Sequence, residues 1–392
     1  MRERRPLLRR ALFAAAAAAL LAAPAGAQTY FNQSVMHEVR IVIDPADWTS
    51  LRENFMSNQY YAANISIDGQ VVQQVGIRSR GKGSRSGTKP HLRVDFNRYV
   101  TGQELQGRKA IVLDNLIQDG SFLREALTYH AFEAVGLPAP KTAFTRVTVN
   151  DVYWGLYALT EEVSKPFLAS RLGEDGGNLF KYEYVNPYDF SYLGPNPAAY
   201  VPVPFQPETN ENTLDTSGLV EFIRTINEAP SATFTQTISA YLDVPRFLLY
   251  LAVENAAAEN DGFVGYAGMN NLYLYQYAGQ KRFVFIPWDK DNTFQSPTWP
   301  VMNRLDSNVL TRRLMEDPTQ AALYRESVKQ VAAVAVNSGV LGAKADELYT
   351  LIREHALTDD KKPFSNEDFE GSVGALKAII AARQADVLSQ VP

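Results

Sequence analysis

The sequence of 392 residues contains no cysteine. Disulfide bonds, thiolate catalysis and zinc–thiolate sites are therefore excluded. Histidine is also scarce, because only four are present, at positions 37, 91, 130 and 355, and no two of them form a His-x-x-x-His pair. This scatter argues against a zinc hydrolase. Without disulfides the fold depends on its core, and a chain of this length with 46% hydrophobic residues can bury a large one.

Positive charge is in deficit over most of the chain. The formal net charge is −5, and residues 1–27 contain five Arg and one Glu, so the remaining residues carry −9. Nucleic-acid binding depends on basic groups that neutralise phosphates, and an acidic chain without an extended basic run lacks them. The composition therefore predicts no nucleic-acid partner.

Only the N-terminus carries a long apolar run. Residues 11–24 (ALFAAAAAALLAAP) follow an arginine-rich start and lead into Ala25-Gly26-Ala27. Basic start, apolar run and small-residue site together predict a signal peptide over residues 1–27, cleaved after Ala27. We therefore expect an exported protein, periplasmic or extracellular, without stable membrane insertion after cleavage. The alternative is an uncleaved anchor, although the run is short for a membrane span.

The rest of the chain shows strand patterns first and helical patterns later. Alternating residues at 37–44 and β-branched runs beside turn signals predict a β-rich N-terminal lobe over residues 28–185. Six prolines in residues 186–217 predict an insertion or linker. Helical spacing dominates residues 218–392, which also contain a predicted hairpin. This order predicts an α+β fold in two lobes.

Acidic and amide side chains stand at both ends of that hairpin. The runs NNLYLYQYAG and KRFVFIPW meet at a short loop, Ala278-Gly279-Gln280. Asn260 and Asp261 precede the first strand, Asn270 and Asn271 begin it, and Asp289 and Asp291 follow the second. A hairpin brings these ends together, and in an extended 289–291 segment both carboxylates would point to one side. Their oxygens suit magnesium. The alternative is turn formation, which Asp and Asn also favour.

A second polar stretch, residues 78–90 (RSRGKGSRSGTKP), is basic and rich in Gly and Ser. Glycines let backbone N–H groups turn inward, and Arg or Lys can neutralise phosphate charge, so the stretch is a candidate phosphate-binding loop. The alternative is a mobile, solvated loop. In addition, the order Asp261, Asn271, Asp289 matches the order of acceptor-orienting Asp, metal-binding Asn and metal-binding Asp in protein kinases.

The motifs between residues 75 and 295 resemble the spore-coat protein H (CotH-type) family of atypical kinases. The similar pieces, in chain order, are RGKGSR (80–85), LDN (113–115), DGSFLRE (119–125), GLPAP (136–140), VNDVYWGLYALTEEV (149–163), NLFK (178–181) and IPWDKDNTF (286–294). Each piece alone is weakly specific, whereas the tryptophan-containing blocks in this order are specific together.

The resemblance implies a diverged protein-kinase-like fold, ATP with Mg²⁺ or Mn²⁺ as cofactors, and a secreted or envelope protein as substrate. It implies that Asp261 orients the acceptor hydroxyl, and that Asn271 and Asp289 bind metal with support from Asp291. It also implies a phosphate-neutralising cation at Lys89 or Arg93. The remaining nucleotide-binding candidates are Arg80, Gly81, Lys82, Gly83, Ser84, Glu161 and Lys181.

Two other functions fit parts of the sequence. Asp289-Lys290-Asp291-Asn292-Thr293 matches the D-x-D-x-T motif of aspartyl-phosphate phosphatases, in which the first Asp is the nucleophile. That motif follows the first strand of a parallel sheet, whereas here it comes late in the chain. A non-catalytic surface or scaffold protein that keeps the fold is the other alternative. A calcium loop that starts at Asp289 lacks the Gly and the terminal Glu of the EF-hand pattern.

Overall fold

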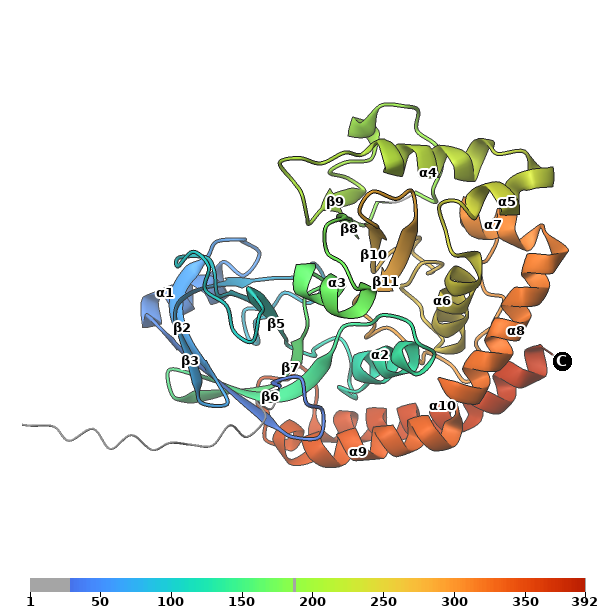
Figure 1. Cartoon of the computed structure of the whole chain (residues 1–392). Helices are drawn as coiled ribbons and strands as arrows, with labels where there is room; N and C mark the ends of the chain where they lie inside the picture. Colours follow the sequence, from blue (N-terminus) through green and yellow to red (C-terminus); the bar gives the residue numbers. More distant parts are fainter. Residues whose placement is uncertain (1–28, 186–187, 392) are drawn as a thin grey trace, which may run out of the picture.

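A computed structural model describes residues 29–185 and 188–391. The predicted signal peptide therefore lies outside the described residues. The described chain forms two lobes, a smaller β-rich one and a larger one made mainly of helices (Figure 1). The predicted α+β class and the order of the two lobes are confirmed. No helix in the described ranges combines the length and apolarity that crossing a bilayer requires.

The N-terminal lobe is a closed barrel, and not the open sheet of a protein kinase. Seven strands follow the order β1-β2-β3-β4-β5-β7-β6, and the parallel pairing of β1 with β6 closes it. Alternate residues on β1, such as Val39 and Ile41, fill the interior. The strands are β1 (His37–Ile43), β2 (Tyr61–Ile67), β3 (Gln70–Ser79), β4 (Leu92–Asp95), β5 (Ala110–Asp114), β6 (Thr142–Val149) and β7 (Val152–Thr160), with α1 (Pro45–Glu53) packed outside.

A second, antiparallel sheet belongs to the larger lobe. Its order is β11-β10-β8-β9, with β8 (Asn178–Tyr182), β9 (Phe205–Pro207), β10 (Leu272–Gln276) and β11 (Phe283–Pro287). The β10–β11 hairpin forms as predicted. The expected boundary at residue 185 does not match this sheet, because Phe180 pairs with Leu274 and Phe180 also pairs with Pro207. Residues 178–182 and the proline-rich segment thus add strands to the C-terminal lobe, through pairings too distant in sequence for a local pattern to reveal.

Helices cover this sheet and extend beneath the barrel (Figure 1). α6 packs against α8, and α9 and α10 run side by side, with α9 also contacting β7. Helices dominate the chain from residue 217 onward, as the spacing of its apolar residues predicts. The helices are α2 (Arg124–Ala134), α3 (Lys165–Leu172), α4 (Ser217–Glu228), α5 (Phe234–Ile238), α6 (Val244–Ala256), α7 (Val309–Met315), α8 (Pro318–Val334), α9 (Ser338–Leu357) and α10 (Asn366–Gln390).

Candidate active site

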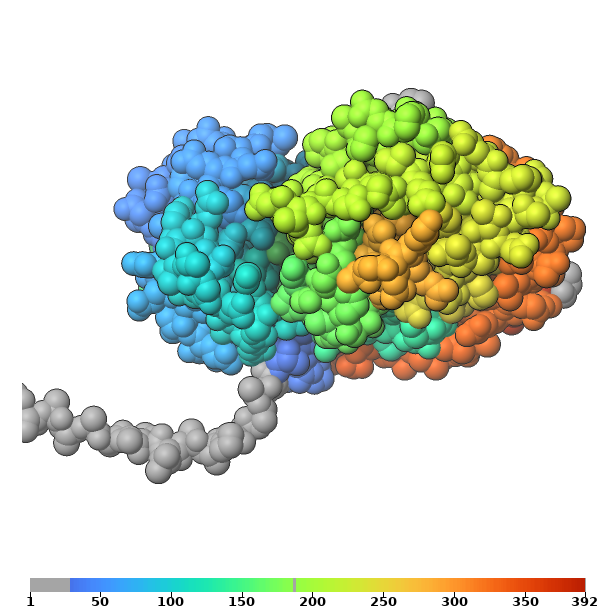
Figure 2. All heavy atoms as spheres, turned by 45° about the horizontal axis from the view of Figure 1, so that its top comes forward, coloured from blue at the N-terminus to red at the C-terminus, as the bar shows by residue number. Residues whose placement is uncertain are grey.

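A cleft of about 1310 Å³ lies between the barrel and the second sheet, and Figure 2 shows the hollow between the blue-to-cyan lobe and the green-to-yellow one. Residues from both lobes line it, so sequence segments far apart meet there. The predicted site residues among the lining are Arg80, Gly81, Lys82, Gly83, Ser84, Arg93, Lys181, Asp261, Asn271, Asp289 and Asp291. Two predicted residues, Lys89 and Glu161, are not part of the lining.

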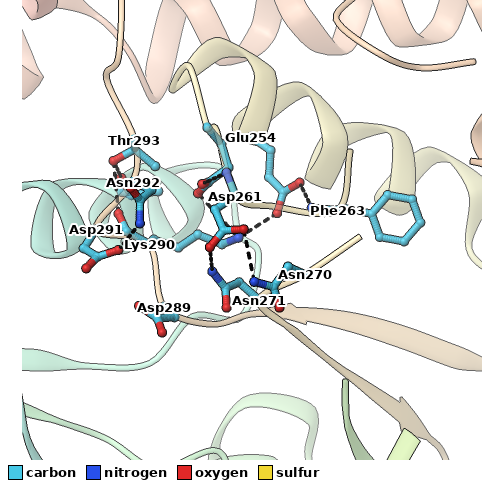
Figure 3. Close-up of polar contacts among 12 residues, drawn as sticks. Glu254, Asp261, Phe263, Asn270, Asn271, Asp289, Lys290, Asp291, Asn292 and Thr293 are labelled. Carbon is cyan, nitrogen blue, oxygen red and sulfur yellow. Dashed lines mark hydrogen bonds and ion pairs between the residues drawn. The ribbon is translucent and has the colours of Figure 1, made fainter. Parts of the chain in front are cut away.

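Asp261 lies in the turn between α6 and β10. The helix ends at Ala256, and Ala258 then adopts a left-handed conformation with φ of 51°, which turns the chain away from the helix axis. The Asp261 carboxylate accepts hydrogen bonds from the side-chain amides of Asn270 and Asn271, each at 3.0 Å (Figure 3). These two amides hold the carboxylate in place. Asn271 uses its amide nitrogen here, so its amide oxygen is the atom left to bind a cation.

Asp289 and Asp291 follow β11 at the same end of the cleft. The expected extended segment is absent, because Asp289 is left-handed with φ of 52° and the chain turns at once. Asn271, which lies beside this turn at the open end of the hairpin, is left-handed as well, with φ of 54°. Asn and Asp tolerate this conformation better than most residues, and such strained positions concentrate at functional sites. Both carboxylates nevertheless face the cleft.

Half-buried carboxylates, together with the buried Glu125, surround this end of the cleft. Burial raises the pKa of Asp289 above its usual range, and the nearby Asp114 raises it further. Burial, Asp289 and Asp114 together raise the pKa of Asp291 well above normal. Glu125 has its pKa raised to about 8, by burial first and then by Asp114 and Asp289. Like charges held together in a buried place create a site that a divalent cation would neutralise.

The donor set fits a hard cation that retains other ligands. No three His, Cys, Asp or Glu side chains within residues 29–185 and 188–391 converge closely enough to hold a metal by themselves. Magnesium usually keeps water and phosphate oxygens beside one or two carboxylates, which agrees with Asp289, Asp291 and the Asn271 oxygen. His91, which is buried, has no hydrogen-bond partner for Nε2, and that atom lies 3.7 Å from an Asp114 oxygen. An imidazole nitrogen without a hydrogen-bond partner thus lies beside the acidic pocket.

Sequence reasoning did not assign roles to Asp114 and Glu125. Asp114 ends β5, and Glu125 stands in the first turn of α2, where its Oε1 accepts a hydrogen bond from the Tyr129 hydroxyl at 2.8 Å. The same hydroxyl accepts one from the Asp289 N–H at 3.0 Å. Both acids belonged to recognised motifs, and an acid directly after a strand was a usable signal for Asp114. Their proximity to Asp289 depends on tertiary packing.

The expectation for Lys89 requires a correction. Its ammonium is fully buried and lies 2.7 Å from an Asp359 oxygen, in the turn between α9 and α10. Asp359 also accepts a hydrogen bond from the Leu156 N–H at 3.0 Å. Lys89 therefore joins the barrel to the C-terminal helices and does not reach the cleft. The sequence shows the positive charge of Lys89, but its partner Asp359 belongs to a segment that is remote in sequence.

Of the two candidate cations Lys89 and Arg93, Arg93 is the one that reaches the cleft. Its Nε lies 2.6 Å from a Glu162 oxygen, and its Nη1 lies 2.8 Å from an Asp95 oxygen. Glu162 lines the cleft too. Glu161, the residue expected there, is buried in ion pairs with Arg108 and Arg171 instead. Neighbouring residues point to opposite sides of an extended chain, so a position beside the predicted one supplies the cleft carboxylate.

The glycine-rich loop is anchored by hydrogen bonds and not free in solvent. One buried amide, Asn115 Nδ2, donates to the carbonyls of Ser84 at 2.8 Å and Lys89 at 2.7 Å. Gly81 is left-handed with φ of 95°, and a Cβ there would lie 2.4 Å from the Ser84 hydroxyl, so glycine is required. The Arg80 guanidinium lies 4.9 Å from the ring centroid of Trp288, immediately before Asp289.

Two of the lysines that line the cleft share one carboxylate. Lys181 lies 2.6 Å from Glu183, and Lys82 lies 3.2 Å from the other oxygen of the same side chain. The basic loop and the second sheet are thus connected across the cleft. Phosphate oxygens that entered between Arg80, Lys82 and Arg93 would meet positive charge at one end and the acidic cluster at the other.

The sequence matches the family described as CotH kinase protein over residues 77–387. It is 24% identical over 346 residues to the inner spore coat protein H of Bacillus subtilis (strain 168), covering 86% of this chain and 92% of that protein. It is also 21% identical over 288 residues to the invasin CotH7 of Rhizopus delemar, covering 67% of this chain but only 44% of the invasin. The match includes the barrel strands from β3 onward, the cleft and the C-terminal helices.

Proposed function

The chain belongs to the CotH kinase family, and we propose that it transfers the γ-phosphoryl group of ATP to hydroxyl side chains of a protein. The observation that carries this proposal is the composition of the cleft. A glycine-rich basic loop from the barrel faces Asp261, Asn271, Asp289 and Asp291 from the other lobe. Phosphoryl transfer needs positioning and charge neutralisation more than covalent chemistry, and both kinds of group are present.

Each part of the cleft has a role in this reaction. A bound Mg²⁺ or Mn²⁺ would neutralise phosphate charge, and Asp289, Asp291 and the Asn271 oxygen would hold it. Arg80 and Arg93 would bind phosphate oxygens from the barrel side. Asp261, held by its two amide donors, would accept a hydrogen bond from the acceptor hydroxyl and orient it toward the phosphoryl group.

We propose that the acceptor is a secreted or envelope protein. The predicted signal peptide supports export, and the two relatives are named as a spore coat protein and an invasin. An enzyme of this kind would act in the periplasm or outside the cell. The phosphatase alternative has less support, because the strand before Asp289 is at the edge of an antiparallel sheet and not the first strand of a parallel one.

The test is incubation of the mature protein with γ-labelled ATP, with and without Mg²⁺ or Mn²⁺, followed by mass spectrometry. We expect metal-dependent phosphorylation of the protein itself or of an added acceptor. Asp261→Asn keeps shape but removes charge, and we expect it to lower transfer about a hundredfold or more, the scale of a lost general base, with ATP affinity little changed. If the protein is a scaffold, neither the wild type nor Asp261→Asn should become phosphorylated. Equal phosphorylation of the two proteins would show that Asp261 has no part in the mechanism.

A further inference from the structure

Lys290 stands between two proposed metal ligands but points away from them. Asp289 and Asp291 line the cleft, whereas the Lys290 side chain runs beneath it toward α6 (Figure 3). Its ammonium is fully buried, 2.8 Å from a Glu254 oxygen and 3.5 Å from a Glu259 oxygen. Both glutamates are buried as well. A buried cation thus lies between two buried carboxylates, directly behind the site.

The two glutamates hold the backbone of the loop that carries Asp261. Glu259 Oε1 accepts a hydrogen bond from the Asp261 N–H at 2.8 Å, and Glu254 Oε2 accepts one from the Phe263 N–H at 2.9 Å. Gly262 lies against both, because a Cβ there would be 2.6 Å from Glu259 Cγ and 2.8 Å from Glu254 Oε2. Through these two hydrogen bonds and the packing of Gly262, the glutamates that pair with Lys290 contact residues 261–263.

A backbone contact joins the same two loops. The Asn260 N–H donates to the Asn292 carbonyl at 3.0 Å. Further backbone bonds join the adjoining residues, from the Phe294 N–H to the Ala257 carbonyl at 2.6 Å and from the Gln295 N–H to the Ala258 carbonyl at 3.4 Å. The Lys290 connection passes through side chains instead, so substitution can alter it without changing the backbone.

We propose that Lys290 is a positioning residue for phosphoryl transfer. It connects the metal-binding loop at 289–291 to the acceptor loop at 259–263, and so fixes Asp261 relative to Asp289. The proposal depends on the proposed kinase function. Buried ion pairs are weak evidence for stability, because desolvation offsets the attraction, whereas their geometric demands suit a role in fixing one arrangement. A small displacement of a reacting group has large effects on rate.

The charge balance explains why a lysine suits this place. Burial opposes the charged form, yet the attraction of Glu254 and Glu259 raises the pKa of Lys290 above its ordinary value. A neutral residue would leave two carboxylates together without a cation, and they would separate or bind protons. Either change would release the Asp261 or Phe263 N–H from its present acceptor.

The experiment compares Lys290→Met with the triple variant Lys290→Met/Glu254→Gln/Glu259→Gln. The triple variant keeps amide oxygens as acceptors for the Asp261 and Phe263 N–H groups and has no unpaired buried charge. It can therefore be measured in place of the single variant if the single variant does not fold. Lys281→Met is the matched control, because Lys281 belongs to the same hairpin and pairs with Glu221 on the exposed surface. Leu348→Ala, a buried change in α9, controls for lost stability.

We expect the turnover number for transfer to fall about tenfold or more in the Lys290 variants, with the KM for ATP within about twofold of wild type, since tenfold is the effect of a modest loss of positioning. We also expect faster amide hydrogen exchange in residues 259–263. Lys290→Arg, which keeps the charge, should recover part of the turnover. Neither control should alter the turnover or the exchange of this loop.

The two readouts separate the inference from the function on which it depends. A wild-type protein that transfers no phosphate overturns the proposed function, and a role in transfer with it. Active wild type together with a folded Lys290 variant of unchanged turnover and unchanged loop exchange overturns the positioning role alone. An equal loss in Leu348→Ala would show that lowered stability is the cause, which also overturns it.

Discussion

Arg93 and Lys89 carry the same charge in the same part of the chain, yet only one faces the cleft. Arg93 meets Glu162 and Asp95 at the cleft wall, whereas Lys89 meets Asp359 in the interior. The type of residue that a phosphate site needs was evident from the sequence. Which of the two cations would reach it was not, because the answer depends on an acid located in the turn after α9.

We expect substitutions of the two cations to have different effects. Arg93→Ala should weaken ATP affinity about tenfold or more, because it removes a charge-assisted phosphate contact worth roughly 1.5–3 kcal/mol. Lys89→Met should leave ATP affinity nearly unchanged but lower the melting temperature strongly, since breaking a buried ion pair costs about 3–5 kcal/mol. Calorimetric titration and thermal melts measure both effects.

The exposed Arg40→Ala on β1 serves as the control for loss of a surface charge and should change neither quantity. A Lys89→Met protein that keeps its melting temperature but loses ATP binding would show that Lys89 does serve the nucleotide.

At the scale of elements, the site is built from the ends of regular structure. β10 begins after Asn271, β11 ends before Asp289, and α6 ends before Asp261. Turn residues and strand patterns predicted this hairpin and its polar ends, because both are local signals. β8 and β9 were not placed with it, since their pairing partners lie in other segments. The barrel closure between β1 and β6 is equally non-local.

The close packing of Gly262 gives a prediction for the loop between α6 and β10. Gly262→Ala adds a Cβ where Glu259 and Glu254 leave no room, so the loop must shift and Asp261 with it. We expect transfer to fall about tenfold or more while ATP affinity stays within about twofold of wild type, because the proposed nucleotide contacts lie elsewhere.

The control is Gly342→Ala in α9, where a Cβ meets no atom within 4 Å and alanine favours the helix. Transfer kinetics and ATP titration of the two variants decide the matter. A Gly262→Ala enzyme with wild-type turnover would show that the loop accommodates the added carbon without moving Asp261.

At the scale of the whole molecule, the cleft depends on how the lobes are held together. Residues 161–164 connect β7 to α3, and the Lys89–Asp359 pair joins the barrel to the turn beneath it. Gly155 permits this approach, because a Cβ there would lie 2.5 Å from both Asp359 oxygens. The two-lobed α+β organisation could be predicted from the order of patterns. The helices under the barrel could not, because no local signal specifies what α9 packs against.

Because the proposed metal site is acidic, we expect the response to metal to depend on pH. Glu125, at the acidic end of the cleft, has its pKa raised to about 8, and Glu259, which lies behind the cleft beside Lys290, has its pKa raised to about 7, in both cases mainly by burial. These groups bind protons more tightly in the folded state than in the unfolded state, where carboxyl pKa values are about 4.3. Their contribution to stability is therefore present below about pH 4.5 and is lost as pH rises through about 7–8. Without metal, like-charge repulsion is then greatest at alkaline pH.

A divalent cation should reverse that loss, because it binds the deprotonated carboxylates and only the folded state presents them together. We expect Mn²⁺ to raise the melting temperature more at pH 8 than at pH 6. Asp289→Asn should abolish this difference. It should also raise the melting temperature of the metal-free protein at pH 8, since it removes one of the neighbouring negative charges. Asp346→Asn, at an exposed position, should change neither the Mn²⁺ effect nor the melting temperature of the metal-free protein. Thermal melts at both pH values, with and without Mn²⁺, give the answer, and an equal Mn²⁺ effect at pH 6 and pH 8 would place the cation away from these carboxylates.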